Sequence, residues 1–348
     1  MGLEARYEGV GRIHARETAT GSPGTGEVLV RIERCGICGS DLHTFRGQSE
    51  LPRFCPGHEM SGIVEAAGSG AGGVREGDRV VVEPIVRCGS CRHCLSGNYH
   101  LCGRLALCGV SAPGGMASHI VVPDYTLFKL PAALDFELGA LAEPTAVTVH
   151  AARLGGVGRN SRVLVLGAGT IGLLAAAAAR HLGAAYVAIS ARHPQQKKLA
   201  RALGVDEVLD PDKLRTAGEK PDVVLETVGG AATTVADGML AVARGGTIVM
   251  IGLFEKTPVF DPGVMILKEV RLVGSMVYNR PETGLADFDL ALVGGGFAGS
   301  LLAQRDLKLE GTQKLALVVG NGAYPKWPLR NPANDARAVA QALSSVGF

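Results

Sequence analysis

The stretch SRVLVLGAGTIGLLAAAAARHLG, residues 161–183, decides the fold. It starts with branched aliphatic residues typical of a buried strand, passes through a glycine-rich turn and ends in an alanine-rich segment typical of a helix. A strand that runs through GxGxxG into a helix is the fingerprint of dinucleotide binding, because the glycines let a pyrophosphate approach the helix N-terminus. The alternative is a glycine-rich turn that binds no nucleotide. The predicted cofactor-binding residues of this turn are Gly167, Gly169, Thr170, Ile171 and Gly172.

Strand-like and helix-like segments alternate after this turn. The segments are YVAIS (186–190), PQQKKLARAL (194–203), DVVLET (222–227), AATTVADGMLAVA (231–243), GTIVMIG (246–252) and RLVGS (271–275). Alternation of this kind predicts an α/β fold with a parallel, doubly wound sheet.

Composition limits the class of protein. A chain of 348 residues that is 47% hydrophobic favours two domains. The formal net charge of +2, without a run of Lys and Arg, argues against nucleic acid as a partner. No apolar run reaches the roughly 18 residues that a membrane-spanning helix needs, and the N-terminus lacks the apolar stretch of a secretory signal. We therefore expect a cytoplasmic protein without a membrane segment.

All eight cysteines lie in the first third of the chain, and four of them form C-x2-C-x2-C-x7-C. In a long chain without an export signal, such spacing indicates a metal site rather than a disulfide framework. Four thiolates suit a tetrahedral, closed zinc site with a structural role, with an iron–sulfur site or free cysteines as the alternatives. The predicted ligands, in a lobe spanning residues 86–103, are Cys88, Cys91, Cys94 and Cys102.

Residues for a second, open metal site lie upstream and downstream of this lobe. Cys38 lies in RCGICGSDLH (34–43), His58 in PGHEM (56–60), and Glu143 in LAEPTAVTVH (141–150). Catalytic zinc usually has three protein ligands and one open position. Each residue alone is compatible with a structural role, but together they predict a mixed Cys/His/Glu site.

These motifs, in this order, resemble the zinc-dependent medium-chain dehydrogenase/reductase family. The resemblance rests on CGICGSDLH, GHE, GDRV (77–80), the four-cysteine lobe, the EP at Glu143 and GAGTIG, and covers about residues 5–280. It is strongest to the sorbitol, threonine and butanediol dehydrogenase branch. The resemblance implies a GroES-like catalytic domain over residues 1–150, a Rossmann NAD(P)-binding domain over 151–282, and a homodimer or homotetramer.

The resemblance also implies roles for residues around the open metal site. Cys38 and His58 correspond to ligands of a catalytic zinc, with Glu143 as a third ligand. Glu59 either ligates directly or exchanges with the bound water or substrate, so which carboxylate ligates stays open. Asp41 is expected to orient the His58 imidazole.

Two further residues correspond to a proton path. Ser40 resembles the hydroxyl that accepts the proton of the substrate, and His43 the imidazole that passes it to solvent. Their alternatives are a turn cap and a solvated surface histidine. The implied activity is hydride transfer between a secondary alcohol, polyol or vicinal diol and a nicotinamide cofactor, with one catalytic and one structural Zn²⁺.

The segment after the second strand of the dinucleotide unit bears on the choice of cofactor. NAD-binding proteins carry an acidic residue about 20 residues beyond the glycines, whereas an Arg accommodates the 2′-phosphate of NADP. Here YVAIS continues into Ala191 and Arg192, and no Asp or Glu occurs from residue 144 to residue 205. We therefore predict NADP, with Lys197 and Lys198 assisting, and an NAD-linked threonine or sorbitol dehydrogenase as the alternative.

The resemblance ends near residue 282. Residues 286–304 present a second glycine motif like the start of a flavoprotein domain, and residues 314–348 resemble the first strand and helix of a caspase-like domain. No His or Cys follows His193, so protease activity is not expected. We expect 283–348 to be a grafted segment, in which KLALVV could replace the final strand of the family. If it cannot, the chain would be a catalytically impaired nucleotide-binding scaffold.

Overall fold

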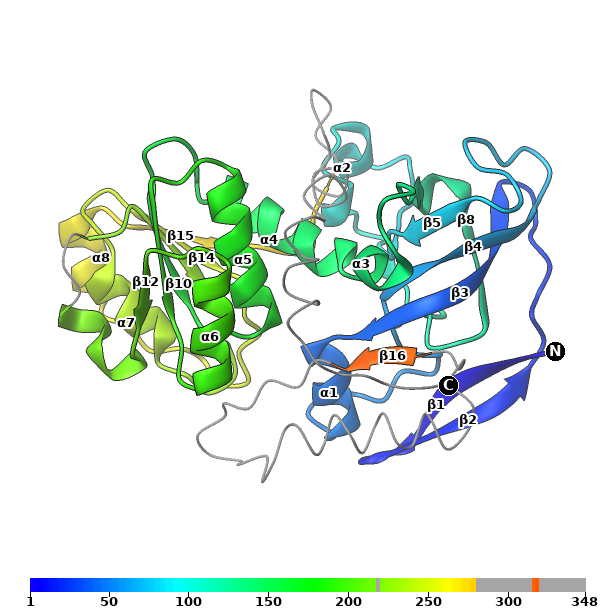
Figure 1. The fold of residues 1–348 in the computed structure, drawn as a ribbon, viewed down its shortest axis with the longest axis horizontal. Coiled ribbons are helices and arrows are strands. Elements are labelled where there is room, and N and C mark those ends of the chain that lie inside the picture. Colours follow the sequence, from blue (N-terminus) through cyan, green and yellow to red (C-terminus); the bar gives the residue numbers. More distant parts are fainter. Residues whose placement is uncertain (217–219, 280–314, 319–348) are drawn as a thin grey trace.

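The computed structural model describes residues 1–216, 220–279 and 315–318, and it contains the predicted parallel sheet. Six parallel strands follow the order β12-β11-β10-β13-β14-β15, so that the sheet grows in both directions from β10, the strand before the glycine turn (Figure 1). The strands are β10 (Arg162–Leu166), β11 (Tyr186–Ser190), β12 (Glu207–Leu209), β13 (Val223–Glu226), β14 (Thr247–Met250) and β15 (Arg271–Gly274). We call residues 162–274 the parallel-sheet unit.

Helices cover this sheet, and the first of them packs closely because its side chains are small. Helix α5 contacts β10, β11 and β13, and Ala175, Ala176 and Ala179 are fully buried against them. The helical segments of this unit are α5 (Thr170–His181), α6 (Pro194–Ala202), η3 (Pro211–Thr216), α7 (Thr234–Ala241) and α8 (Pro262–Lys268). The sequence predicts all of the strands except β12, whose three residues are too few to show a period.

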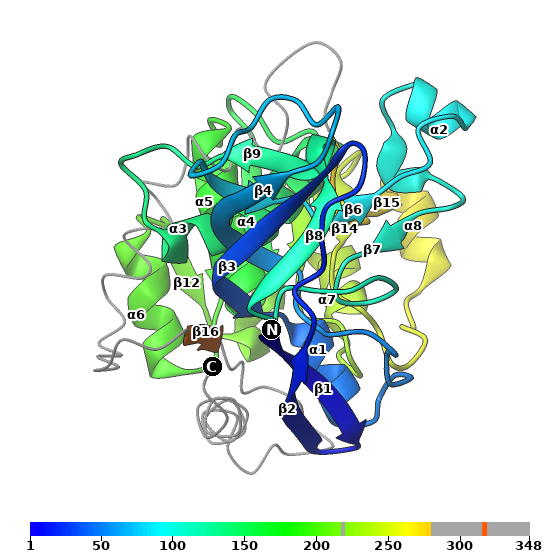
Figure 2. The same ribbon diagram turned by 90° about the vertical axis from the view of Figure 1, so that its right-hand side faces the viewer.

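A mixed sheet forms the second unit, residues 1–140 together with 315–318, which we call the antiparallel-sheet unit because most of its strand pairs are antiparallel (Figure 2). Its order is β16-β3-β4-β5-β9, and β8 also pairs with β3. Fully buried valines of β3 and β5, among them Val28, Val30 and Val80, form its core. The sheet strands are β3 (Glu27–Ile37), β4 (Glu59–Ala67), β5 (Arg79–Val82), β8 (His119–Pro123), β9 (Leu127–Lys129) and β16 (Leu315–Val318). Two short pairs complete the strands: β1 (Gly2–Gly9) with β2 (Arg12–Thr18), and β6 (Ile85–Val86) with β7 (Ala106–Leu107).

Helix α4 (Ala142–Leu154) joins the two units. It contacts β4 of the antiparallel-sheet unit as well as α5 and β14 of the parallel-sheet unit (Figure 1). The remaining helical segments are α1 (Gly39–Phe45), α2 (Arg92–Leu95), η1 (Tyr99–Leu101), η2 (Asp124–Thr126) and α3 (Phe136–Ala140). Within the described residues, every helix is too short or too polar to span a lipid bilayer.

The chain that follows β15 returns to the cysteine lobe. Tyr278 is fully buried in a cluster that includes Tyr99 and Ile85. Asn279 donates hydrogen bonds from Nδ2 to the backbone oxygen of Gly97 at 3.3 Å and to Oδ1 of Asn98 at 3.2 Å. The lobe is thus tied to residues about 180 positions later in the chain.

The strand that the sequence suggests as a replacement for the final strand of the family lies at an edge of the mixed sheet. β16 pairs in parallel with β3, with Leu315 opposite Arg34 and Val318 opposite Ile37. The second glycine motif and the rest of the segment expected over 283–348 lie outside the described residues.

The buried centre of the parallel sheet should dominate its stability. Leu225 in β13 is fully buried, whereas Leu253, in the same unit, is 72% exposed. We expect Leu225→Ala to lower the free energy of unfolding by roughly 2–5 kcal/mol, because it removes packing and leaves a cavity. The matched control Leu253→Ala should change it by less than about 0.5 kcal/mol. Denaturant unfolding followed by circular dichroism measures both, and equal effects would contradict the assigned core.

Candidate active site

The pairing of β3 with β4 brings the residues of the predicted open metal site together. The register places Gly36 opposite Glu59, so the loop that leaves β3 at Cys38 lies beside His58, the residue before β4. The ligand atoms of Cys38, His58 and Glu59 all lie within 4.8 Å of one another. A thiolate, an imidazole and a carboxylate at this separation fit a zinc ion with one open position.

Two glycines make room for this cluster. A Cβ at Gly36 would overlap Oε2 of Glu59, so that only glycine leaves the carboxylate in place. Gly57 has φ of +94°, and a Cβ there would lie 2.6 Å from Sγ of Cys35. Glycine is therefore required at position 57, directly before His58, and at position 36, opposite Glu59.

Asp41 connects the two loops that carry Cys38 and His58. Its carboxylate accepts hydrogen bonds from the backbone N–H of Cys38, at 2.9 Å, and of Gly57. Burial raises the pKa of Asp41, and the neighbouring His58 opposes that shift. Nδ1 of His58 is buried and has no hydrogen-bond partner among the described residues. Asp41 thus orders the backbone around His58 and acts on its imidazole through charge.

Glu143 lies in the first turn of α4 and is buried, but it is not a member of the Cys38 cluster. Burial raises its pKa to about 7 and that of Glu59 to about 8, while the His58 charge lowers both. The structure therefore brings Glu59, rather than Glu143, into ligand distance of Cys38 and His58. Glu143 is close enough for its charge to raise the pKa of His58, although burial alone would lower that pKa.

The two residues of the expected proton path both lie on α1. Ser40 is the second residue of the helix and half-buried, and the N-cap position belongs to Cys38, so Ser40 is not the turn cap. The side chain of His43 is only 17% exposed, and its Nδ1 lies 3.2 Å from Oε1 of Glu255. His43 is therefore not a solvated surface histidine.

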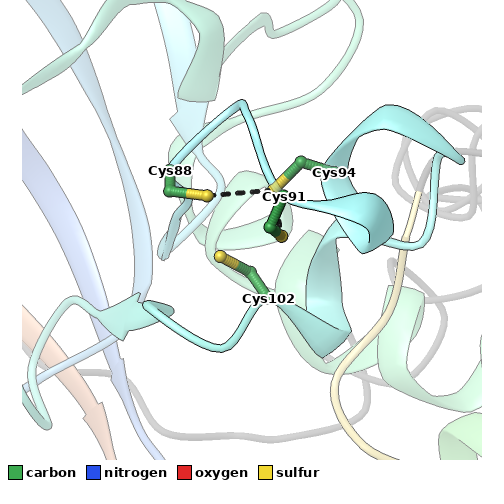
Figure 3. Close-up of side chains that lie close together, drawn as sticks. All are labelled: Cys88, Cys91, Cys94 and Cys102. Atoms are coloured by element: carbon green, nitrogen blue, oxygen red, sulfur yellow. Dashed lines mark hydrogen bonds between the residues drawn. The ribbon is translucent and has the colours of Figure 1, made fainter.

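Figure 3 shows the four cysteines of the lobe pointing toward one centre. Sγ of Cys94 lies 3.8 Å from Sγ of Cys88 and 3.5 Å from Sγ of Cys91. A disulfide requires about 2.05 Å, whereas thiolates on a tetrahedral zinc with 2.3 Å bonds lie about 3.8 Å apart. Since all four ligand positions are filled by sulfur, the lobe fits a closed zinc site and leaves none for a substrate.

Local backbone geometry favours the thiolate form of one of these cysteines, Cys88. Hydrogen bonds from the backbone of Ser90 and Cys91 lower the pKa of Cys88 to about 5, and the Arg104 side chain adds a further bond. Gly89, with φ of +71°, allows the tight turn that aims these amides at the sulfur. Burial and the neighbouring thiols raise the pKa of Cys94 to about 11, which a bound cation would reverse.

The glycine turn after β10 has the shape that a pyrophosphate needs. Gly167 has φ of +99°, and a Cβ at Gly172 would overlap the carbonyl oxygen of Gly167. Ser190, the last residue of β11, accepts a hydrogen bond from Gly167 N at 2.8 Å and so holds the turn against the sheet. The N-terminus of α5, with Thr170 as its first residue, therefore opens at the carboxyl end of β10.

The end of β11 carries the residues predicted to select the cofactor. Ala191 is buried and Arg192 is exposed. Lys197 lies 3.6 Å from Asp210 in an ion pair, so its charge is already partly compensated, and Lys198 is exposed. Of the three predicted cations, Arg192 lies nearest the end of β11 in the chain.

Sequence patterns missed several residues that shape these sites. Gly36 lies in the motif of Cys38 and Ser190 ends YVAIS, but neither pattern shows their roles, because each of them, like Glu255, acts on a residue distant in the chain. Arg104, two residues after Cys102, was detectable as a cation beside a cluster of thiolates.

Comparisons with known families match three separate stretches of the chain. Residues 24–132 match the family model of the alcohol dehydrogenase GroES-like domain, and residues 170–291 match that of the zinc-binding dehydrogenases. Residues 313–348, which include β16, match the model of the caspase domain.

Individual relatives cover most of the chain. It is 35% identical over 298 residues to a 2-dehydro-3-deoxy-L-galactonate 5-dehydrogenase of Pseudoalteromonas atlantica, covering 83% of this chain and 85% of the relative. It is 33% identical to a sorbitol dehydrogenase of Halalkalibacterium halodurans, covering 78% and 83%. The crystal structure of a putative zinc-binding dehydrogenase from Sinorhizobium meliloti, bound to NADP, superposes with a TM-score of 0.77 at 32% identity, covering 86% and 89%. The chain therefore belongs to the zinc-dependent medium-chain alcohol dehydrogenase family and is an NAD(P)-dependent alcohol oxidoreductase.

Proposed function

We propose that the chain oxidises a secondary alcohol of a polyol, sugar-acid or vicinal-diol substrate, with NADP⁺ as the hydride acceptor. The observation that carries the proposal is the cluster of Cys38, His58 and Glu59, which fits an open zinc site. The names of the relatives support a polyhydroxy substrate, since one is a sorbitol dehydrogenase and another a dehydrogenase of a galactonate derivative.

The reaction removes a proton and a hydride from the alcohol. Bound zinc would supply a Lewis acid that lowers the pKa of the alcohol hydroxyl, and bound nicotinamide would take the hydride. Ser40 accepts the hydroxyl proton and His43 passes it to solvent, and both lie on α1 beside Cys38. Asp41 holds the loops of Cys38 and Gly57 together through hydrogen bonds to both backbones. The metal ligands therefore do not have to rearrange when zinc binds.

The two carboxylates take different roles in this proposal. Glu59 is the third ligand, because its oxygen lies within the cluster. Glu143 lies outside the cluster but interacts with both His58 and Glu59, so it serves as the carboxylate that exchanges or supports the ligand set.

The lobe of Cys88, Cys91, Cys94 and Cys102 holds a second zinc with a structural role. Its closed ligand set leaves no position for substrate. Because Tyr278 and Asn279 pack against the lobe, this zinc fixes the place where the chain returns from β15. We assign residues 1–150 to the catalytic domain and 151–282 to the Rossmann domain.

NADP is favoured over NAD because the end of β11 presents Arg192 and no acidic residue. An acidic side chain at this place would hold the ribose hydroxyls and repel a 2′-phosphate.

A homodimer or homotetramer is proposed from one exposed edge. β15 is the last strand of the parallel sheet as described, and none of the residues of the adjacent α8 is buried. Ile266 and Leu267 of α8 are both 73% exposed. An exposed apolar helix, followed by an edge strand with no further partner among the described residues, is a surface that a second copy of the chain would cover.

A catalytically impaired, nucleotide-binding scaffold is the second candidate. It is favoured by the match of residues 313–348 to the caspase domain instead of to a dehydrogenase. Turnover of an alcohol by the full chain would reject it.

The zinc proposal predicts a difference between two neighbouring glycines. Gly36→Ala places a methyl group on Oε2 of Glu59 and should displace the carboxylate, whereas a Cβ at Gly39 meets no atom within 4 Å. Metal analysis of protein purified without chelator should give about two zincs per chain for the wild type and Gly39→Ala, and about one for Gly36→Ala. Two tightly held zincs in Gly36→Ala would contradict the assignment of Glu59.

Cofactor selection predicts an effect of Arg192 that Arg201 does not share. Both are exposed arginines of the parallel-sheet unit, but only Arg192 lies within two residues of the end of β11. Arg192→Asp should lower kcat/KM with NADP by roughly 10–100-fold, because a charge-assisted bond to the 2′-phosphate is lost. The matched variant Arg201→Asp should retain the wild-type kcat/KM with NADP. A wild-type enzyme that turns over NAD more efficiently than NADP would reject the preference.

The proposed interface predicts that a charged substitution on α8 lowers the molar mass of the protein in solution. Light scattering should give two or four times 36.0 kDa for the wild type and a smaller species for Ile266→Asp. Val10→Asp, at a residue 63% exposed in the antiparallel-sheet unit, is the control and should leave the mass unchanged. A monomeric wild type would refute the interface.

A further inference from the structure

One close contact between a histidine and a carboxylate connects the two units beside the candidate active site. His43 belongs to α1 of the antiparallel-sheet unit, and Glu255 follows β14 in the parallel-sheet unit. Nδ1 of the histidine lies 3.2 Å from Oε1 of the glutamate, and their side chains are 17% and 32% exposed. The contact is therefore partly shielded from water, and it exists only while the two units face each other as they do here.

The backbone around Glu255 is fixed by a turn that precedes α7. Glu255 N donates to the carbonyl oxygen of Gly230 at 3.0 Å, and Gly230 N donates to that of Leu253 at 2.7 Å. Gly230 also forms an isolated parallel bridge with Phe254. A Cβ at Gly229 would overlap the carbonyl oxygen of Leu253, so the two segments are as close as glycine permits.

A buried carboxylate at the end of β13 organises that turn in its own right. Oε1 of Glu226, which is fully buried, accepts hydrogen bonds from Val228 N at 2.9 Å, Gly229 N at 3.0 Å and Thr234 Oγ1 at 2.7 Å. The Glu226 side chain, anchored in the sheet, therefore fixes the turn at Val228 and Gly229. That turn fixes the backbone of Glu255. Glu255 is presented to His43 by a rigid support and not by a free loop.

We propose that Glu255 is a positioning residue for His43, which fixes the orientation and tautomer of the imidazole across the boundary between the two units. The inference rests on the proposed function, in which His43 passes the substrate proton to solvent. A carboxylate only accepts hydrogen bonds, so its charge 3.2 Å from Nδ1 favours the tautomer in which Nδ1 carries the proton. In the neutral ring Nε2 is then the acceptor, the state that a proton relay needs to take a proton from Ser40.

The tautomer of His43 is the direct test, and it needs no turnover. Proton–nitrogen correlation spectra of histidine-labelled full-length protein report which ring nitrogen is protonated at about pH 9, where an ordinary histidine is neutral. His43→Gln assigns the signal among the nine histidines of the chain. We expect Nδ1–H in the wild type and a shift toward Nε2–H in Glu255→Ala. Retention of the Nδ1–H form in Glu255→Ala would overturn the proposal.

Kinetics test whether the pair matters for the reaction. In a single turnover, Glu255→Ala should slow hydride transfer about tenfold, the loss expected of a misoriented acid–base group, with KM for the alcohol unchanged. In a His43→Ala background the same change should alter the rate less than twofold, because Glu255 acts through His43. The control Glu269→Ala removes an exposed carboxylate that follows α8, far from α1 in Figure 1, and should have no effect.

The outcomes separate this inference from the proposed function. Additive effects of His43→Ala and Glu255→Ala would overturn the positioning role while leaving the dehydrogenase intact. A zinc-loaded wild type that oxidises no alcohol would refute the proposed function, and the tautomer spectra would still decide whether Glu255 sets the state of His43.

Discussion

The register of β3 against β4 is the constraint on which the candidate active site depends. Pairing Gly36 with Glu59 brings the end of one strand beside the start of the next, and this places Cys38 next to His58 and Glu59. A slip of one residue would turn Glu59 to the other face of the sheet. Because Gly36 has no side chain, the Glu59 carboxylate lies where a Cβ at position 36 would be. The stability of the sheet thus supports a ligand set that no single loop could hold.

The two cysteine-containing sites follow different physical rules. The lobe gathers Cys88, Cys91, Cys94 and Cys102 within 15 residues, and hydrogen bonds from its own backbone lower the pKa of Cys88. The site at Cys38 is assembled from separate strands and keeps an open position, while burial penalises its charged carboxylates. A cation relieves that penalty, and the proposed chemistry requires the open position. The first arrangement suits a structural metal, and the second suits a catalytic one.

The sequence predicts those parts of the fold and of the sites that depend on residues close together in the chain. The glycine turn, its flanking strand and helix, and the cysteine lobe are local patterns, and the structure contains each of them. Which carboxylate joins Cys38 and His58, Glu59 or Glu143, could not be predicted from the sequence. It depends on distances between β4 and α4. The pairing of His43 with Glu255 was invisible for the same reason, since the two residues come from different units. The parallel pairing of β16 with β3 depends on contacts between residues 281 positions apart, such as Leu315 and Arg34.

X-ray absorption of the zinc-loaded full chain tests the central claim most directly, because it counts sulfur neighbours without depending on substrate. Two sites, one with four thiolates and one with a single thiolate, predict about 2.5 sulfur ligands per zinc on average, with nitrogen or oxygen neighbours completing the shell. A value close to four would mean that only the lobe holds zinc. That result would contradict the account of a catalytic site built on Cys38, His58 and Glu59.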